Sequence, residues 1–183
     1  MAFTVADLVG NPWWVAMRKS QQTGILIAEA ISRCENRSFI LIGHSLGARA
    51  AVSALHVLST REMSERSSRI CDVHLLGGAA DLGDAGQWRI ATDAIAGKCY
   101  NYYTKNDGVL TYLYRIFNLG QSSPTGISKL PTSDHTKEKL ISIDCSREVD
   151  EHCGYHRMLG RILQVEKTRP ARRGFWNRLL GRK

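Results

Sequence analysis

Residues 41–50 read LIGHSLGARA and contain the pattern Gly-x-Ser-x-Gly, centred on Ser45. An apolar, β-prone run over residues 38–42 precedes the pattern, and apolar residues at helical spacing follow it over residues 46–58. A strand, a sharp turn and a helix in this order are typical of a nucleophile elbow, which exposes a serine hydroxyl at the edge of a sheet. The alternative interpretation is an ordinary turn bounded by two glycines.

Signals for strands and helices alternate along the rest of the chain. Helical spacing of apolar residues predicts helices over residues 12–34, 46–58, 88–95, 109–119 and 155–165, and short apolar or aromatic runs predict strands over residues 38–42, 73–78, 99–103 and 140–143. This alternation is typical of the α/β class, with a mostly parallel sheet and helices on both faces.

Length and composition favour one globular domain in a reducing compartment. The chain has 183 residues, of which 43% are hydrophobic, which is enough for one domain with a hydrophobic core and too few for two. We expect a domain over residues 1–166 and a tail over residues 167–183. The five cysteines are scattered, and neither a signal peptide nor a membrane-spanning run is evident. These features predict a cytoplasmic protein, with a peripheral position at a membrane as an open alternative.

The net charge of +8 comes from one end of the sequence. Residues 167–183 hold seven Lys and Arg and no Asp or Glu, so the rest of the chain is close to neutral. A nucleic-acid-binding protein would spread its basic residues over a surface with interleaved aromatic residues. The distribution of charge therefore argues against a nucleic-acid partner.

A serine nucleophile needs a base and an acid that orients the base, and in folds of this kind the order along the chain is Ser, acid, His. Asp107 follows the third predicted strand and is the preferred acid, although it also fits a plain Asn-Asp-Gly turn. Asp81, which follows the second predicted strand, is the reserve acid. The backbone N–H of Leu46 is the expected oxyanion donor.

The candidate base lies between the fourth predicted strand and the last predicted helix. This segment contains His152 and His156, four residues apart. A pair at this spacing can bind a metal when it lies on one helical face, but no matching carboxylate–histidine motif completes a site. We expect His152 to be the base, keep His156 in reserve, and predict neither a metal nor another cofactor.

Several spaced motifs occur in this chain in the same order as in a known family. The chain resembles the α/β-hydrolase-like family called domain of unknown function 726, which includes transmembrane and coiled-coil domain-containing proteins. The resemblance covers most of residues 8–165 and is carried by Asn11-Pro-Trp with Ala16, Gly24 and Ala28, by residues 41–49, by residues 75–79 with Trp88, by residues 101–107 with residues 112–115, and by residues 152–155. It favours Asp107 over Asp81 and His152 over His156.

The chain also departs from the pattern of this family. Gly108 stands where the family usually has tryptophan, and Glu151 stands where it usually has glycine. A complete hydrolase of this type has further strands before the first helix, with the loop that supplies a second oxyanion donor. The resemblance therefore implies the C-terminal half of the fold, truncated on its N-terminal side. Such a sheet would expose an edge that can pair with a second copy or with a partner chain.

The expected activity is that of a serine esterase or lipase-like hydrolase. Residues 169–183 place Phe175, Trp176 and two leucines among arginines, a pattern that can lie on an anionic membrane surface and that favours a lipid ester as substrate. The tail also fits a disordered basic end or a helix that docks on the body. The competing hypothesis is an inactive, hydrolase-like binding or scaffold module that associates with a membrane or a partner chain.

Overall fold

The computed structural model describes residues 11–61, 69–114 and 122–161. By its internal contacts the chain divides into two units, Met1–His152 and Cys153–Lys183, and each is treated by itself. In the second unit, residues 156–161 are helical. The basic tail predicted over residues 167–183 lies outside the described residues.

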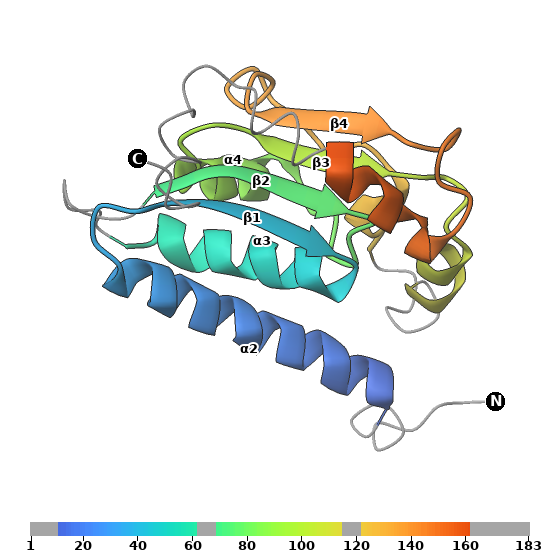
Figure 1. The fold of residues 1–183 in the computed structure, drawn as a ribbon, viewed down its shortest axis with the longest axis horizontal. Coiled ribbons are helices and arrows are strands. Elements are labelled where there is room, and N and C mark those ends of the chain that lie inside the picture. Colours follow the sequence, from blue (N-terminus) through green and yellow to red (C-terminus); the bar gives the residue numbers. More distant parts are fainter. Residues whose placement is uncertain (1–10, 62–68, 115–121, 162–183) are drawn as a thin grey trace. The chain divides into compact units, whose positions relative to one another are not determined.

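The first unit is built on a four-stranded parallel sheet with strand order β1-β2-β3-β4 (Figure 1). This sheet confirms the α/β class. The elements are α2 (Pro12–Arg33), β1 (Ser38–His44), α3 (Leu46–Ser59), β2 (Arg69–Leu76), α4 (Ala85–Asp93), β3 (Cys99–Tyr103), η1 (Val109–Tyr114), η2 (Thr125–Ile127), β4 (Leu140–Asp144) and η3 (His152–Tyr155).

Helix α2 begins where the sequence predicts it to begin. The side chain of Asn11 accepts a hydrogen bond from the Trp13 N–H at 2.9 Å. Pro12 occupies the first turn, where the backbone N–H that proline lacks would have no acceptor within the helix. Gly24 lies in the contact with α3, because a Cβ at this position would stand 2.4 Å from the carbonyl oxygen of Ala50. The two helices can therefore approach closely only with glycine at residue 24.

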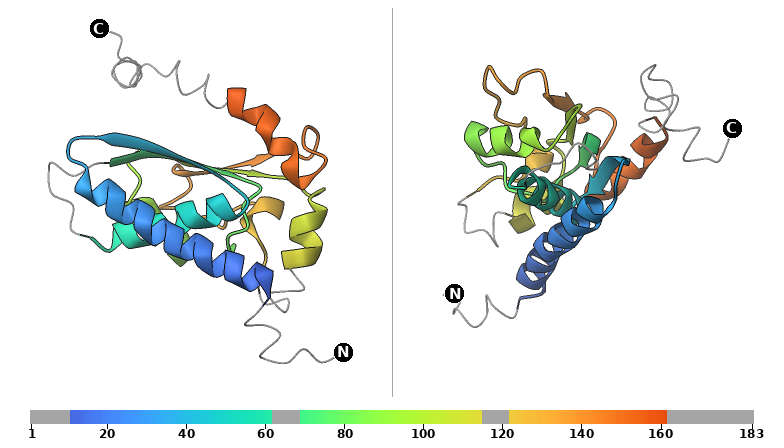
Figure 2. Two further views of the ribbon diagram at one scale, coloured as in Figure 1. Left: turned by 60° about the horizontal axis from the view of Figure 1, so that its bottom comes forward. Right: turned by 90° about the vertical axis from the view of Figure 1, so that its left-hand side faces the viewer.

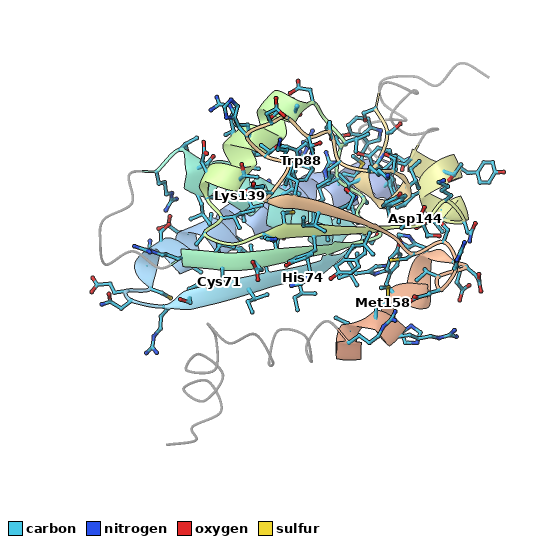
Figure 3. The ribbon with its side chains drawn as sticks, turned by 90° about the horizontal axis from the view of Figure 1, so that it is seen from above. Cys71, His74, Trp88, Lys139, Asp144 and Met158 are labelled. Atoms are coloured by element: carbon cyan, nitrogen blue, oxygen red, sulfur yellow. The ribbon has the colours of Figure 1, made fainter. Side chains whose placement is uncertain are left out.

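Helices α2, α3 and α4 share one face of the sheet (Figure 2). Their apolar residues form one buried cluster with strand residues such as Leu75 and Cys99. Figure 3 shows Trp88 of α4 on this side of the sheet, whereas Cys71 and His74 of β2 point to the opposite side. The sequence predicted helices on both faces, but the described α-helices of the first unit cover only one.

The predicted boundaries differ from the observed ones at several elements, and α4 spans Ala85–Asp93 instead of residues 88–95. Strand β1 continues to His44, and β2 begins at Arg69, before the apolar run that marked it in the sequence. The helix predicted over residues 109–119 is a π-helix over Val109–Tyr114, after which the chain leaves the described residues. Apolar spacing does not distinguish a π-helix from an α-helix over so few turns.

Candidate functional site

Ser45 lies between β1 and α3 in a backbone conformation that residues with a side chain rarely adopt. Its φ is 55° and its ψ is −119°, and such strain persists only where the surroundings enforce it. The Ser45 N–H donates to the Leu76 carbonyl at 3.0 Å, and the Ser45 carbonyl accepts from the Ala79 N–H at 3.0 Å. The end of β2 and the loop behind it therefore hold the turn from both sides.

The two glycines of the motif have different roles. A Cβ at Gly43 would stand 2.5 Å from the carbonyl carbon and oxygen of Gly47, so the turn excludes a side chain at residue 43. A Cβ at Gly47 would meet no neighbouring atom within 4 Å. The turn therefore requires glycine at residue 43, while no contact in the structure requires glycine at residue 47.

The structure brings Ser45, His152 and Asp107 together at the carboxyl edge of the sheet. The Oγ of Ser45 lies 2.8 Å from Nε2 of His152, and Nδ1 of His152 lies 2.6 Å from Oδ2 of Asp107. Because a carboxylate only accepts, Nδ1 donates to Asp107, which leaves Nε2 of the neutral ring to accept from the serine hydroxyl. In this arrangement the imidazole can take the proton of Ser45 while the carboxylate stabilises the resulting cation.

Asp107 is held by the turn that follows β3. Its side chain is fully buried, and its second oxygen, Oδ1, accepts from the Leu110 N–H at 2.9 Å. Each carboxylate oxygen therefore has its own donor, and the oxygen that faces His152 has a fixed direction. Asp107 thus lies at the end of β3, as the sequence predicted.

The loops that carry Asp107 and His152 are tied to each other. The Thr104 hydroxyl donates to the Val149 carbonyl at 2.9 Å, and the side-chain amide of Asn106 donates to the Ser146 carbonyl at 2.8 Å. These bonds join the loop after β3 to the loop after β4. His152 is the first residue of the short helix η3, rather than part of an open loop as the sequence suggested.

Leu46 is the first residue of α3, directly after Ser45. The first N–H groups of a helix have no acceptor within the helix, and they carry the positive end of its dipole. The Leu46 N–H, at this end of α3, stays the predicted oxyanion donor.

The two reserve candidates have other partners. Asp81 is paired with Arg49, whose Nη2 lies 3.1 Å from Oδ2, and it also accepts from the Tyr114 and Ser122 hydroxyls at 2.5 and 2.7 Å. Partial burial opposes ionisation of Asp81, but the donors Ser122 and Tyr114 and the charge of Arg49 hold its pKa below the ordinary value. His156, in the second unit, donates from Nδ1 to the Cys153 carbonyl.

The structure adds one residue that the sequence gave no reason to single out. His44 precedes Ser45 in the motif, and its Nε2 lies 2.8 Å from the carbonyl oxygen of His152. The sequence shows only that these residues are 108 positions apart, so the contact is visible only in the fold. Among the described residues, no group of three His, Cys, Asp or Glu could hold a metal ion.

Comparison with known proteins shows the family of the chain. The family described as "Protein of unknown function (DUF726)" matches residues 1–168. The chain belongs to this family. The match includes every residue of the Ser45–His152–Asp107 cluster.

Curated relatives of the chain come from three different organisms. The chain is 31% identical over 164 residues to "Uncharacterized membrane protein F35D11.3" of Caenorhabditis elegans, a match that covers 88% of this chain and 26% of the relative. It is 30% identical over 162 residues to "Uncharacterized membrane protein C6F6.13c" of Schizosaccharomyces pombe, covering 87% and 27%. It is 28% identical over 160 residues to "Transmembrane and coiled-coil domain-containing protein STS1" of Oryza sativa subsp. japonica, covering 86% and 23%.

The DUF726 chain spans about a quarter of the length of these curated relatives. The two relatives from worm and fission yeast are named membrane proteins. In the part of this chain that the structure describes, no helix has both the length and the apolar character needed to span a bilayer. No solved structure gives a significant match to the chain.

Proposed function

We propose that this DUF726 chain is a serine hydrolase of the α/β-hydrolase type that cleaves carboxylic esters. One observation carries the proposal: Ser45 Oγ, the imidazole of His152 and the carboxylate of Asp107 form a continuous line of hydrogen bonds of 2.8 and 2.6 Å. Three such groups from three separate loops give a nucleophile, a base and an acid in the order that acyl transfer requires. The strained turn at Ser45 supports the same role.

In the proposed reaction, Ser45 Oγ attacks the carbonyl carbon of the ester while its proton passes to Nε2 of His152. Asp107 orients the imidazole and stabilises its positive charge. The bond between the carbonyl carbon and the alcohol oxygen then breaks, and the alcohol leaves with the proton from His152. Water then attacks the acyl carbon while its proton passes to Nε2 of His152. The bond between this carbon and Ser45 Oγ breaks, His152 returns the proton to Oγ, and the acid is released with the serine hydroxyl restored.

The Leu46 N–H is the proposed donor to the oxyanion of both tetrahedral intermediates. Loss of one donor of this kind costs roughly 10²- to 10³-fold in rate, so the number of donors at Ser45 sets the scale of the activity. A second donor is expected from segments that lie upstream of the elbow in complete hydrolases of this type. The longer relatives have room for such segments, because the matched region is about a quarter of their length.

A lipid ester is the proposed substrate class. Two relatives are named membrane proteins, and residues 169–183 combine arginines with Phe175 and Trp176, a composition that suits an anionic lipid surface. A hydrolase that is peripheral at a membrane would meet its ester at the bilayer surface. Liposome binding that survives removal of residues 169–183 would contradict this part of the proposal.

A fluorophosphonate probe tests the proposed nucleophile. We expect the wild type to be labelled and Ser45→Ala to be unlabelled, because the probe phosphonylates an activated serine. Ser59→Ala is the matched control, since Ser59 lies on the same helix with its hydroxyl bonded to the His56 carbonyl. Well-folded wild-type protein that stays unlabelled, or Ser45→Ala protein that is labelled as fast as wild type, would disprove the proposal.

The second candidate is a scaffold module that pairs through the free edge of its sheet. The observation that favours it is β1, an apolar strand that is an edge of the described sheet. Exposed edges of this kind recruit further strands. Ile42 is 38% exposed on this strand. An Ile42→Lys variant that loses self-association or partner binding in sedimentation experiments, in a protein that the probe does not label, would favour the scaffold.

A further inference from the structure

His44 contacts both the backbone and the ring of His152. Its Nε2 lies 2.8 Å from the His152 carbonyl oxygen, and because a carbonyl only accepts, Nε2 must carry the proton and donate. The centroids of the two imidazole rings are 4.9 Å apart, and their planes are inclined by 40°. The proposed reaction uses neither contact.

The position of His44 in the chain makes this hydrogen bond a short link between nucleophile and base. His44 is the last residue of β1, and Ser45 follows it directly. The bond therefore fixes the main chain of His152 to the same strand end that carries the Ser45 hydroxyl. Any movement of the His152 backbone away from Ser45 must break or bend this bond.

The His44 bond lies beyond an exposed stretch of main chain. The Thr104 hydroxyl holds the Val149 carbonyl three residues before His152, and Asp150 and Glu151 in between are exposed. The two hydrogen bonds of the imidazole do not replace the link. In acyl transfer the bond between Nε2 and Ser45 is broken whenever His152 passes its proton to the leaving alcohol, and only Asp107 then holds the ring.

We propose that His44 is a positioning residue for His152: its Nε2–H holds the His152 carbonyl and keeps the imidazole within reach of Ser45 throughout the reaction. This proposal rests on the proposed hydrolase function. A misplacement of about 1 Å at a reacting group can cost about 100-fold in rate, so a single backbone bond is sufficient to matter.

The protonation state of His44 is consistent with this role. Partial burial, and secondarily the charge of His152, lower the pKa of His44 and together outweigh the bond to the His152 carbonyl and the charge of Asp107, which raise it. His44 therefore stays neutral at neutral pH. A neutral ring donates to the carbonyl without placing a second cation beside the imidazolium that forms on His152.

Two substitutions separate the hydrogen bond from the ring contact. His44→Phe keeps an aromatic ring beside His152 and removes the donor, whereas His44→Gln keeps a donor at the position of Nε2. We expect His44→Phe to slow fluorophosphonate labelling and kcat for p-nitrophenyl butyrate by roughly 10- to 100-fold with KM changed little, and His44→Gln to retain most of the rate. Exposed His135, substituted in the same two ways, is the matched control.

A second measurement does not depend on activity. The proton on Nδ1 of His152, bonded to Asp107, is expected to give a low-field NMR signal that disappears in His152→Gln. In His44→Phe we expect this signal to broaden or vanish through exchange with water, and in His44→Gln to persist. His44→Leu serves for both measurements if His44→Phe does not fold.

The outcomes distinguish the two proposals. Unchanged labelling and an unchanged signal in His44→Phe would overturn the role of His44 while leaving the hydrolase proposal standing. Equal losses in His44→Gln and His44→Phe would also overturn it, because a hydrogen-bond donor at residue 44 would then restore none of the lost rate. A wild type that is never labelled, but whose His152 signal depends on the donor at residue 44, would end the hydrolase proposal and keep the positioning.

Discussion

Two aspartates follow neighbouring strands of the same sheet, but one is paired with a permanent cation and the other accepts from an imidazole and a backbone N–H. Asp107, after β3, is fully buried and accepts from the imidazole of His152 and from the backbone N–H of Leu110. Asp81, after β2, has a side chain that is 44% exposed and is paired with the guanidinium of Arg49. The two carboxylates share their residue type and their place after a strand, but they differ in the charge that faces them.

The difference shows what a carboxylate needs in order to orient a base. The charge of Asp81 is already balanced by a permanent cation, so little of it remains for a cation that forms during a reaction. The charge of Asp107 faces groups that are neutral until His152 takes a proton. Asp81 is therefore suited to brace the loop behind the nucleophile, and Asp107 is suited to act on the imidazole.

Exchanging each carboxylate for an amide gives the largest expected contrast. Asp107→Asn should lower kcat by on the order of 10⁴-fold, because the amide favours the wrong tautomer of His152. Asp81→Asn should lower it by no more than about tenfold, the equivalent of about 1.4 kcal/mol on the barrier. Steady-state hydrolysis of p-nitrophenyl butyrate measures both, and circular dichroism checks that both variants fold. Similar losses in the two variants would remove the distinction between them.

The Arg49–Asp81 ion pair should matter more for the stability of the fold than for the rate of the reaction. Arg49 donates to the Ala79 carbonyl, to the Tyr114 hydroxyl and to Asp81. Removing one partner of a fully buried ion pair costs 3–5 kcal/mol, but water reaches Asp81, so we expect Arg49→Met to lower the free energy of unfolding by about 2 kcal/mol. Urea denaturation measures this change.

The matched control for Arg49→Met is Arg61→Met, which breaks the more exposed pair with Glu29. Exposed pairs contribute at most about 1 kcal/mol. If the two variants lose equal stability, the Arg49 pair is no more than a surface contact.

A smaller loss of stability is expected when Tyr114 loses its hydroxyl. The hydroxyl donates to Asp81, and partial burial together with this carboxylate raises the pKa of Tyr114, so it remains a neutral donor. Tyr114→Phe keeps the edge-to-face contact with Trp13 and should cost about 1 kcal/mol in urea denaturation. A loss as large as that of Arg49→Met would mean that the tyrosine, rather than the arginine, is the main partner of Asp81.

The smallest expected effect is a change in how stability depends on pH. The pKa of Asp81 lies below its ordinary value of 3.8, so the ionised group stabilises the fold above pH 3.8, and this contribution is lost as the pH falls through the lower, folded-state value. We expect the stability difference between wild type and Asp81→Asn to be constant from pH 7 to pH 5 and to shrink in more acidic solution. A difference that is the same at pH 7 and pH 2.5 would show that Asp81 acts through its shape alone.

The sequence predicted the class of the fold because strands and helices leave periodic patterns, and it predicted the edge of the sheet where polar residues would gather. It ranked Asp107 before Asp81 but could not exclude Asp81 on local pattern, because both follow a strand in a turn. What separates them is Arg49, one helical turn beyond Ser45, whose side chain reaches the loop after β2 only once α3 has packed on the sheet. The contact between His44 and His152 was hidden for the same reason.

The Ser45–His152 hydrogen bond joins residues that are 107 positions apart, and the bond from His152 to Asp107 spans 45. Closing loops of this length costs entropy, which only the completed sheet can offset. A chain folded as far as β3 would have the serine and the aspartate but no base. If Ser45 is the proposed nucleophile, its reactivity toward a serine-directed probe would report that the last strand has docked, and it would serve as a folding assay for the variants at Arg49, Arg61, Asp81 and Tyr114.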